Sequence, residues 1–207
     1  HSARNHSVLH VSTRGQAPVL SFADALLAGL ARDGGLYLPE AYPKLAEQTI
    51  RGFAGKPYAE VARTVVGALA DGAFEPVALA RMIDESCACF RHEAVVPLVQ
   101  IGDNLFVQEL FHGPTLAFKD VAMQLLGRMM DHALTERGQR ATIVGATSGD
   151  TGGAAIEAFK GLANVDIFIL FPRGRVSDVQ RRQMTTVDAP NVLSLIHISE
   201  PTRPRLI

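Results

Sequence analysis

The fold of this chain is decided by one stretch, Ala141-Thr-Ile-Val-Gly-Ala146 followed by Thr147-Ser-Gly-Asp-Thr-Gly-Gly153. Its first six residues are a short apolar run, which is typical of a β-strand buried on both faces. The polar, glycine-rich residues that follow predict a loop, and residues 154–160 predict a helix. A second buried strand is predicted over 165–171, and a helix capped by Ser177 over 178–184. This alternation predicts a parallel α/β sheet with right-handed crossovers.

Outward from this core, the preceding residues predict a hairpin and a helix. Two strands, 95–101 and 105–110, flank Gly102-Asp103-Asn104, and helix-like sequence covers 118–134. Residues 8–92 are mostly helical in pattern, with helices predicted after Ser21 and over 58–69 and 76–90. We therefore expect a helical N-terminal region over 8–92, an α/β domain over 93–192, and a tail over 193–207.

The composition excludes several classes of protein. The 207 residues are 47% hydrophobic with a net charge of -1, which excludes wholesale disorder and argues against a nucleic-acid binder. No apolar run is long enough to cross a bilayer. Cys87 and Cys89 are the only cysteines, too few for a disulfide framework or a four-cysteine zinc site. We expect no metal site, reduced thiols and a cytoplasmic location.

The loop at 147–153 is the first candidate site. A parallel sheet gathers such loops at the carboxyl ends of its strands, where ligands bind. Free N–H groups and the dipole at a helix start favour an anion such as a phosphate or carboxylate, and the hydroxyls of Thr147, Ser148 and Thr151 add donors. The alternative is a tight turn that uses glycine for its geometry alone.

The second candidate is Lys119 in His112-Gly-Pro-Thr-Leu-Ala-Phe-Lys-Asp120. A helix start and apolar neighbours both disfavour the charged ammonium, so we expect a lowered pKa and a nucleophilic amine able to form a Schiff base. The alternative is a surface lysine paired with Asp120 or Glu109.

The segment 112–120 resembles the pyridoxal-phosphate attachment site of the threonine synthase family. Four further stretches resemble the same family in the same order, and the resemblance covers roughly residues 8–192. They are Ser12-Thr-Arg-Gly15, Asp33-Gly-Gly-Leu-Tyr-Leu-Pro39, Ala146-Thr-Ser-Gly-Asp-Thr-Gly152 and Pro172-Arg-Gly-Arg-Val-Ser-Asp-Val-Gln-Arg-Arg-Gln-Met-Thr-Thr186.

This resemblance implies a fold-type II pyridoxal-phosphate enzyme that converts O-phospho-L-homoserine and water into L-threonine and phosphate. It implies that Lys119 binds the cofactor covalently and moves protons at the substrate. The loop that faces the cofactor corresponds to Ser148, Gly149, Asp150, Thr151 and Gly152. His112, Thr115 and Thr147 are expected to border the substrate, and the oligomeric state is left open.

Residues 193–207 do not resemble the family's continuation. We expect them to be foreign, such as translated adapter or vector sequence, or disordered, and Pro201 and Pro204 disfavour a helix or central strand. The family's cradle for the cofactor phosphate lies beyond this point, so we expect an inactive truncation. Two alternatives stay open: another fold-type II lyase, such as a serine/threonine dehydratase, or a noncatalytic small-anion-binding fragment.

Overall fold

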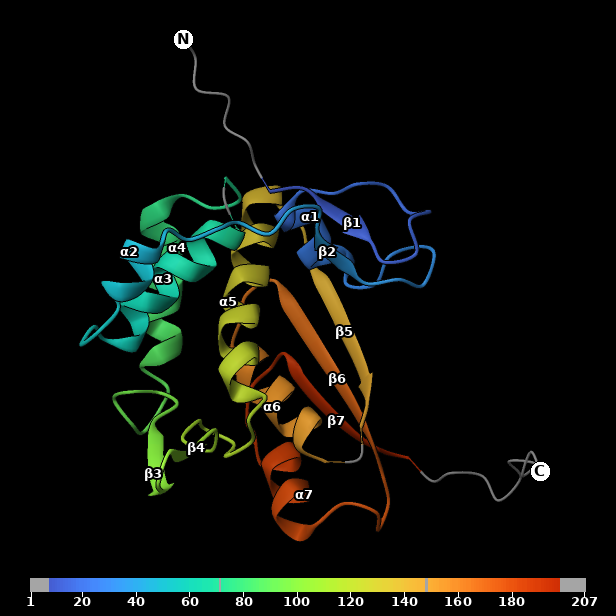
Figure 1. Cartoon of the computed structure of the whole chain (residues 1–207). Helices are drawn as coiled ribbons and strands as arrows, with labels where there is room; N and C mark the ends of the chain where they lie inside the picture. Colours follow the sequence, from blue (N-terminus) through green and yellow to red (C-terminus); the bar gives the residue numbers. More distant parts are fainter. Residues whose placement is uncertain (1–7, 71, 148, 198–207) are drawn as a thin grey trace, which may run out of the picture. The chain divides into compact units, whose positions relative to one another are not determined.

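The structure is a computed structural model that describes residues 8–70, 72–147 and 149–197 (Figure 1). The chain divides into two compact units, and the division falls between Val95 and Val96. The domain limits proposed from the sequence stay a prediction.

The first unit combines four helices with a small antiparallel sheet. Helix α3 covers the range predicted from its apolar face, and Ser21 caps α1 by accepting a hydrogen bond from the Asp24 amide (3.2 Å). The sheet was not predicted, because strands of three residues are too short to show an alternating pattern. The elements are β1 (His10–Ser12), α1 (Phe22–Ala28), β2 (Tyr37–Pro39), α2 (Glu47–Arg51), α3 (Tyr58–Leu69) and α4 (Pro76–Cys87).

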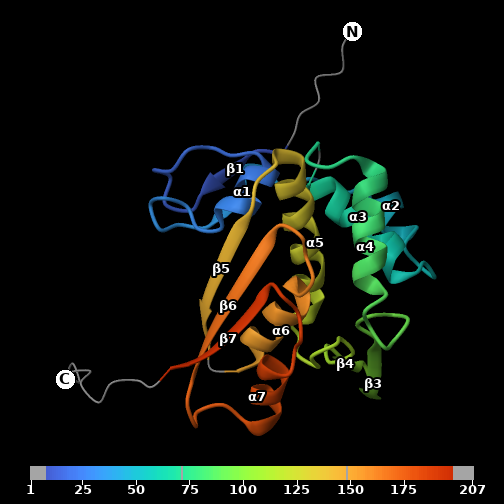
Figure 2. The same cartoon turned by 180° about the vertical axis from the view of Figure 1, so that it is seen from behind.

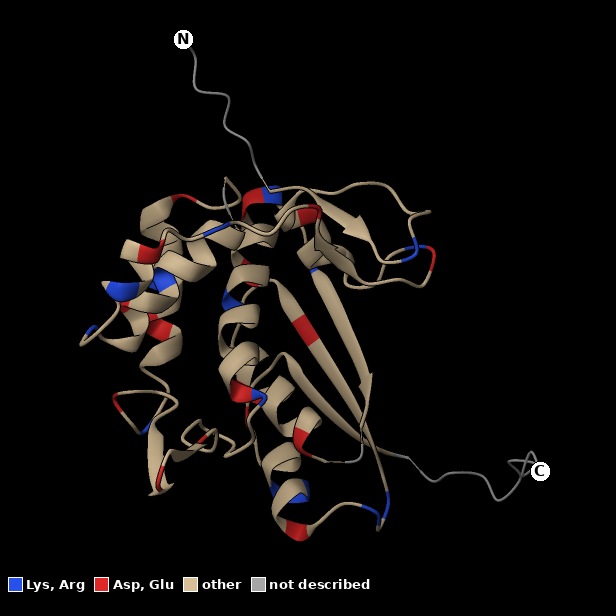
Figure 3. Cartoon of the chain, in the orientation of Figure 1, with Lys and Arg blue, Asp and Glu red and all other residues tan. Residues whose placement is uncertain are grey.

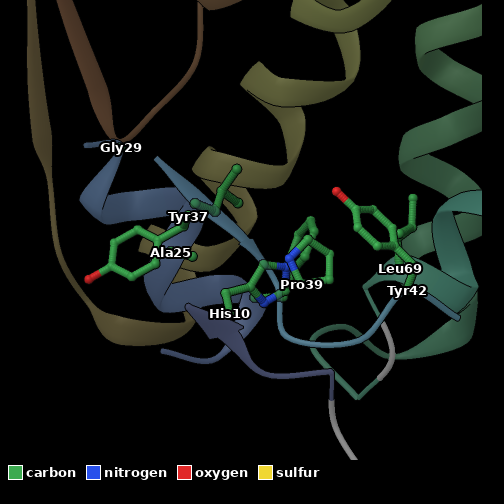
Figure 4. A pocket seen from close by; sticks show the side chains of 9 residues that line it. His10, Ala25, Gly29, Tyr37, Pro39, Tyr42 and Leu69 are labelled. Atoms are coloured by element: carbon green, nitrogen blue, oxygen red, sulfur yellow. The ribbon is translucent and has the colours of Figure 1, made fainter. Parts of the chain in front are cut away.

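The first unit contains a cavity of about 390 Å³. Figure 4 shows His10, Tyr37, Pro39 and Leu69 at its wall, and its remaining lining is mainly apolar. The His10 side chain is 6% exposed, and its ring meets that of Phe22 edge-on at 5.6 Å. Its Nδ1 has no hydrogen-bond partner among the described residues. Burial lowers the pKa of His10, and the Val8 backbone opposes this shift in part.

Acidification should therefore destabilise the first unit. The unfolded chain binds a proton at His10 near its ordinary pKa of 6.5, whereas the folded chain resists protonation, so stability is lost as the pH falls below that value. We expect His10→Phe to reduce the stability lost between pH 8 and pH 5 in urea unfolding. An unaltered acid sensitivity in His10→Phe would contradict this assignment.

The second unit holds a hairpin and a parallel sheet with three helices. The helix predicted over 178–184 carries a capping box, in which Ser177 and Gln180 cap each other's backbone. The elements are β3 (Leu98–Gly102), β4 (Leu105–Gln108), α5 (Asp120–Arg137), β5 (Ala141–Ala146), α6 (Asp150–Phe159), β6 (Val165–Pro172), α7 (Asp178–Thr185) and β7 (Val192–His197).

The sheet has the order β5-β6-β7, with both pairs parallel, as the strand and helix alternation predicted. Alternate residues of β6 are buried, and α5, α6 and α7 lie on one side of the sheet (Figures 1 and 2). The expectation that both faces of β5 are buried is wrong. Its residues alternate between intermediate and exposed, and Val144 is 69% exposed, because the helices of this unit cover only one face of the sheet.

Strand β7 extends into the tail and bears on the disordered alternative alone. Residues 193–197 were expected to be foreign or disordered, but they continue a strand whose Val192 pairs with Ile167 of β6. Their Leu-Ser-Leu-Ile pattern is compatible with a strand. Pro201 and Pro204, which disfavour a helix or a central strand, lie outside the described residues. The origin of this segment stays a prediction.

Helices α5 and α6 touch where α5 has no side chain. A Cβ on Gly127 would lie 2.6 Å from the carbonyl oxygen of Ala158, well inside any allowed contact. Gly127 and Ala158 are both buried. The separation of the two helices is therefore set by direct contact between Gly127 and the α6 backbone.

Charged residues of both signs are interspersed on the helices of each unit (Figure 3). Within the described ranges, no helix is both long and apolar enough to cross a membrane. The same ranges hold no cluster of three or more His, Cys, Asp or Glu side chains suited to a metal ion.

Candidate active site

Lys119 lies directly before the first residue of α5, and its backbone is already helical. The amine is beside the ring of Phe118, with Nζ 4.5 Å from the ring centre. This contact stabilises the cation through the ring's quadrupole. One quarter of the Lys119 side chain is exposed, so the amine is accessible to a small molecule.

The Lys119 amine is paired with Asp150 at the start of α6. Nζ donates a hydrogen bond to Asp150 Oδ2 at 2.7 Å, across 31 residues of sequence. The hydrogen bond from Lys119 lowers the pKa of the Asp150 carboxyl, which stays ionised beside the amine. The sequence predicted an amine with apolar neighbours and did not predict its pairing with Asp150.

The two carboxylates offered as alternative partners bind other groups. Glu109 Oε2 lies 2.7 Å from His112 Nε2, and Asp120 accepts hydrogen bonds from Thr115. Each of these carboxylates thus binds a residue of its own loop, while the Lys119 amine is paired with Asp150.

The glycine-rich loop is shorter than the sequence predicted, since α6 begins at Asp150 and not at Ala154. Asp150, Thr151 and Gly152 form its first turn, and the Gly149 amide donates to Thr147 Oγ1 at 3.4 Å. Ser148 lies outside the described residues. Figure 1 shows the starts of α5 and α6 at the same end of the second unit, which brings the two predicted sites together.

Gly152 is required by packing. A Cβ there would lie 2.4 Å from Thr147 Cγ2 and 2.8 Å from the sulfur of Met184 in α7. Gly149 is similarly close to Gln180, at 2.8 Å. The geometric explanation of these glycines is therefore supported. The Gly149 amide already donates to Thr147 Oγ1 and the Gly152 amide to the Gly149 carbonyl, so the anion alternative rests on the dipole of the α6 start.

Two residues that support the site were missed by the sequence analysis. Asp120 was considered only as a partner for Lys119, yet it is fully buried. Gln183 of α7 donates to the Thr115 carbonyl at 3.1 Å. Gln183 lies in the motif over 172–186, but no local pattern could have shown that it meets Thr115, 68 residues away.

This arrangement provides an accessible amine, a carboxylate on that amine, and the positive end of a helix dipole within one loop cluster. An amine can attack an aldehyde, and the helix start can hold an anion. The cluster can therefore hold a small molecule that carries both an aldehyde and a negatively charged group.

Comparisons with known proteins agree with the sequence motifs. Residues 9–87 match the family described as "Threonine synthase N terminus". The chain is 54% identical over 183 residues to a threonine synthase from Pseudomonas aeruginosa. It is also similar to the crystal structure of a pyridoxal-phosphate-bound threonine synthase from Brucella melitensis, with a TM-score of 0.88 and 64% identity. A yeast threonine synthase structure gives a TM-score of 0.87 and 40% identity.

The matches cover most of this chain but less than half of each relative. The P. aeruginosa alignment spans 88% of this chain and 39% of that protein, and the B. melitensis alignment spans 91% and 40%. The yeast alignment spans 92% and 40%. These similarities confirm the resemblance and the mixed α/β fold, and the chain spans about two fifths of the length of its curated relatives.

Proposed function

We propose that this chain, which matches threonine synthases along about nine tenths of its own length, is the lysine-bearing part of such an enzyme. The proposed reaction converts O-phospho-L-homoserine and water into L-threonine and phosphate, with pyridoxal phosphate as cofactor and a cytoplasmic location. The observation that carries the proposal is the 2.7 Å pair between Lys119 Nζ and Asp150 Oδ2, within two motifs that resemble this family.

The residues of the cluster fit this cofactor. Lys119 would bind its aldehyde covalently, and the α6 start at Gly149 to Gly152, together with Ser148, would face its polar groups. When bound, pyridoxal phosphate stores the negative charge that develops on a substrate carbon. No other residue of the chain combines an accessible amine with this helix start among the parts that the structure describes.

Lys119 and Asp150 supply a site for proton transfer. With pyridoxal phosphate bound, Nζ would be placed to accept a proton from a substrate carbon and to return it at the neighbouring carbon. Asp150 Oδ2 holds the protonated amine in place, because an ionised carboxylate strengthens such a hydrogen bond. The pair thus keeps the proton carrier at one position between transfers.

The proposed neighbours of the substrate phosphate are His112, Thr115 and Thr147. The Thr115 hydroxyl already donates to Asp120 Oδ1 at 2.8 Å, so only its lone pairs remain free to bind. His112 Nε2 is engaged with Glu109. Thr147 Oγ1 accepts from an amide, which leaves its proton available for a phosphate oxygen.

A turnover assay tests the proposal at the level of this chain. We expect no phosphate release from O-phospho-L-homoserine above the blank, because the resemblance assigns the cradle of the cofactor phosphate to a part of the family that this chain does not match. The P. aeruginosa threonine synthase is the positive control. A rate for this chain similar to the control would contradict the expectation of inactivity. Ammonia and a 2-oxo acid formed from threonine would instead favour the dehydratase alternative.

A further inference from the structure

The residue that follows Lys119 is a carboxylate buried without solvent contact. Asp120 is 0% exposed at the first position of α5. Its Oδ2 accepts from the Thr115 amide and its Oδ1 from the Thr115 hydroxyl, both at 2.8 Å. Burying a carboxylate is costly unless hydrogen bonds compensate it, so these two bonds must be well formed.

The loop that Asp120 holds contains a strained residue. Leu116 has a φ of +66°, a left-handed conformation that side chains other than glycine rarely adopt. Leu116 is 52% exposed, so core packing does not impose this conformation. Such strain persists only where surrounding contacts over-determine the backbone. The adjacent Thr115, fixed through its amide and its hydroxyl, provides those contacts.

Two further contacts fix the same loop. Gln183 of α7 donates to the Thr115 carbonyl at 3.1 Å, so every polar group of Thr115 has a partner. A Cβ on Gly113 would lie 2.5 Å from both Cβ and Oδ2 of Asp120, so the loop backbone packs directly on the carboxylate. The loop is therefore clamped from α5 and from α7 just before Lys119.

We infer that Asp120 is a positioning residue: by clamping Thr115 it holds the strained loop that delivers Lys119 Nζ to Asp150 and to the start of α6. Asp120 has no exposed surface that a ligand could contact, so it would act through Thr115. This inference rests on the proposed function, since it explains how the cofactor-binding amine is held in place.

The test is the rate at which Lys119 captures pyridoxal phosphate, trapped by borohydride and measured by peptide mass spectrometry. We expect Asp120→Ala to slow labelling of Lys119 by ~10-fold or more. A displacement of a positioned reactive group by about 1 Å is enough to lower its reaction rate by such a factor. Labelling of Lys160 in the same molecule should not change. A control on the same helix is Asp131→Ala, which also removes hydrogen bonds (to Asn164) but should leave Lys119 labelling unaltered.

Two more variants separate positioning from general damage. In Asp120→Asn the amide can still accept from the Thr115 amide and donate to its hydroxyl, so labelling should return to within ~3-fold of the unmodified chain. Thr115→Val should slow labelling, and adding it to Asp120→Ala should cause no further loss, since the two residues act as one unit. Asp120→Asn and Thr115→Val, each measured alone, decide the question even if Asp120→Ala does not fold.

Each outcome points to a different conclusion. If Asp120→Ala or Thr115→Val labels Lys119 as fast as the unmodified chain, the inference is wrong while the proposed function stands. If Lys119 is not labelled in the unmodified chain, the proposed function itself fails.

Discussion

Replacing Lys119 with alanine is expected to abolish site-specific capture of pyridoxal phosphate by this chain. The chain has four lysines, at positions 44, 56, 119 and 160, so the label can be assigned without ambiguity. Among these, Lys119 combines a side chain that is only 25% exposed with an aromatic ring and the start of a second helix. Borohydride reduction followed by peptide mapping should find the label on Lys119 and none there in Lys119→Ala.

Lys160→Ala is the matched control for this experiment. Lys160 is also paired with a carboxylate, that of Glu157, but its side chain is 44% exposed and it lies at the other end of α6. Removing it should leave the label on Lys119 unchanged. A label that survives in Lys119→Ala at full stoichiometry would show that another amine is the reactive one. Absence of any label in the unmodified chain would favour the noncatalytic anion-binding alternative.

Replacing Asn191 with alanine should cause the largest loss of stability in the second unit. Asn191 is 7% exposed, and its Nδ2 contacts the carbonyls of Phe159, Leu162 and Val165 at 2.8–3.3 Å. Its Oδ1 accepts from the Gly161 amide at 2.8 Å. The alanine variant leaves these backbone groups without partners, so we expect the free energy of unfolding to fall by about 3 kcal/mol. Urea unfolding followed by circular dichroism measures it.

An isosteric variant sharpens this experiment. Asn191→Asp keeps the shape but places a second oxygen against three carbonyl oxygens, so it should destabilise the chain at neutral pH at least as much as alanine. Protonation of the new carboxyl at acid pH should recover part of that loss. Gln139→Ala, at an exposed position of the same unit, should change the free energy by less than about 0.5 kcal/mol. A similarly small change in Asn191→Ala would show that the hydrogen bonds of its side chain do not stabilise the second unit.

The sequence predicted those elements whose pattern is local. Helix α3 matches its predicted range because its apolar residues recur at helical spacing. Helix α6 begins four residues earlier than predicted, because Gly152 and Gly153 read as loop by propensity but are buried by packing. The alternating exposure of β5 was missed because an apolar run does not reveal whether helices cover one face of its sheet or both.

The site was predicted in part, for the same reason. Lys119 and the loop at 147–153 were singled out by motif, but the pair between Lys119 and Asp150 joins residues 31 positions apart, which no local pattern encodes. The burial of Asp120 and the bond from Gln183 to Thr115 also depend on how distant helices pack. Whether Ser148 faces the cofactor remains a prediction, as it lies outside the described residues.

The contact between Gly127 and Ala158 makes the Lys119–Asp150 pair sensitive to a substitution far from either residue. The start of α5 carries the Lys119 amine and the start of α6 carries the Asp150 carboxylate that binds it. The two helices contact each other at a point where the structure has room for a hydrogen atom but not for a methyl group. That point lies eight residues into α5, about 12 Å along its axis from Lys119. A methyl group added at Gly127 would tilt α5 away from α6 and so separate the Lys119 amine from the Asp150 carboxylate. A lineage could thus lose this chemistry through a change that leaves every recognisable motif intact.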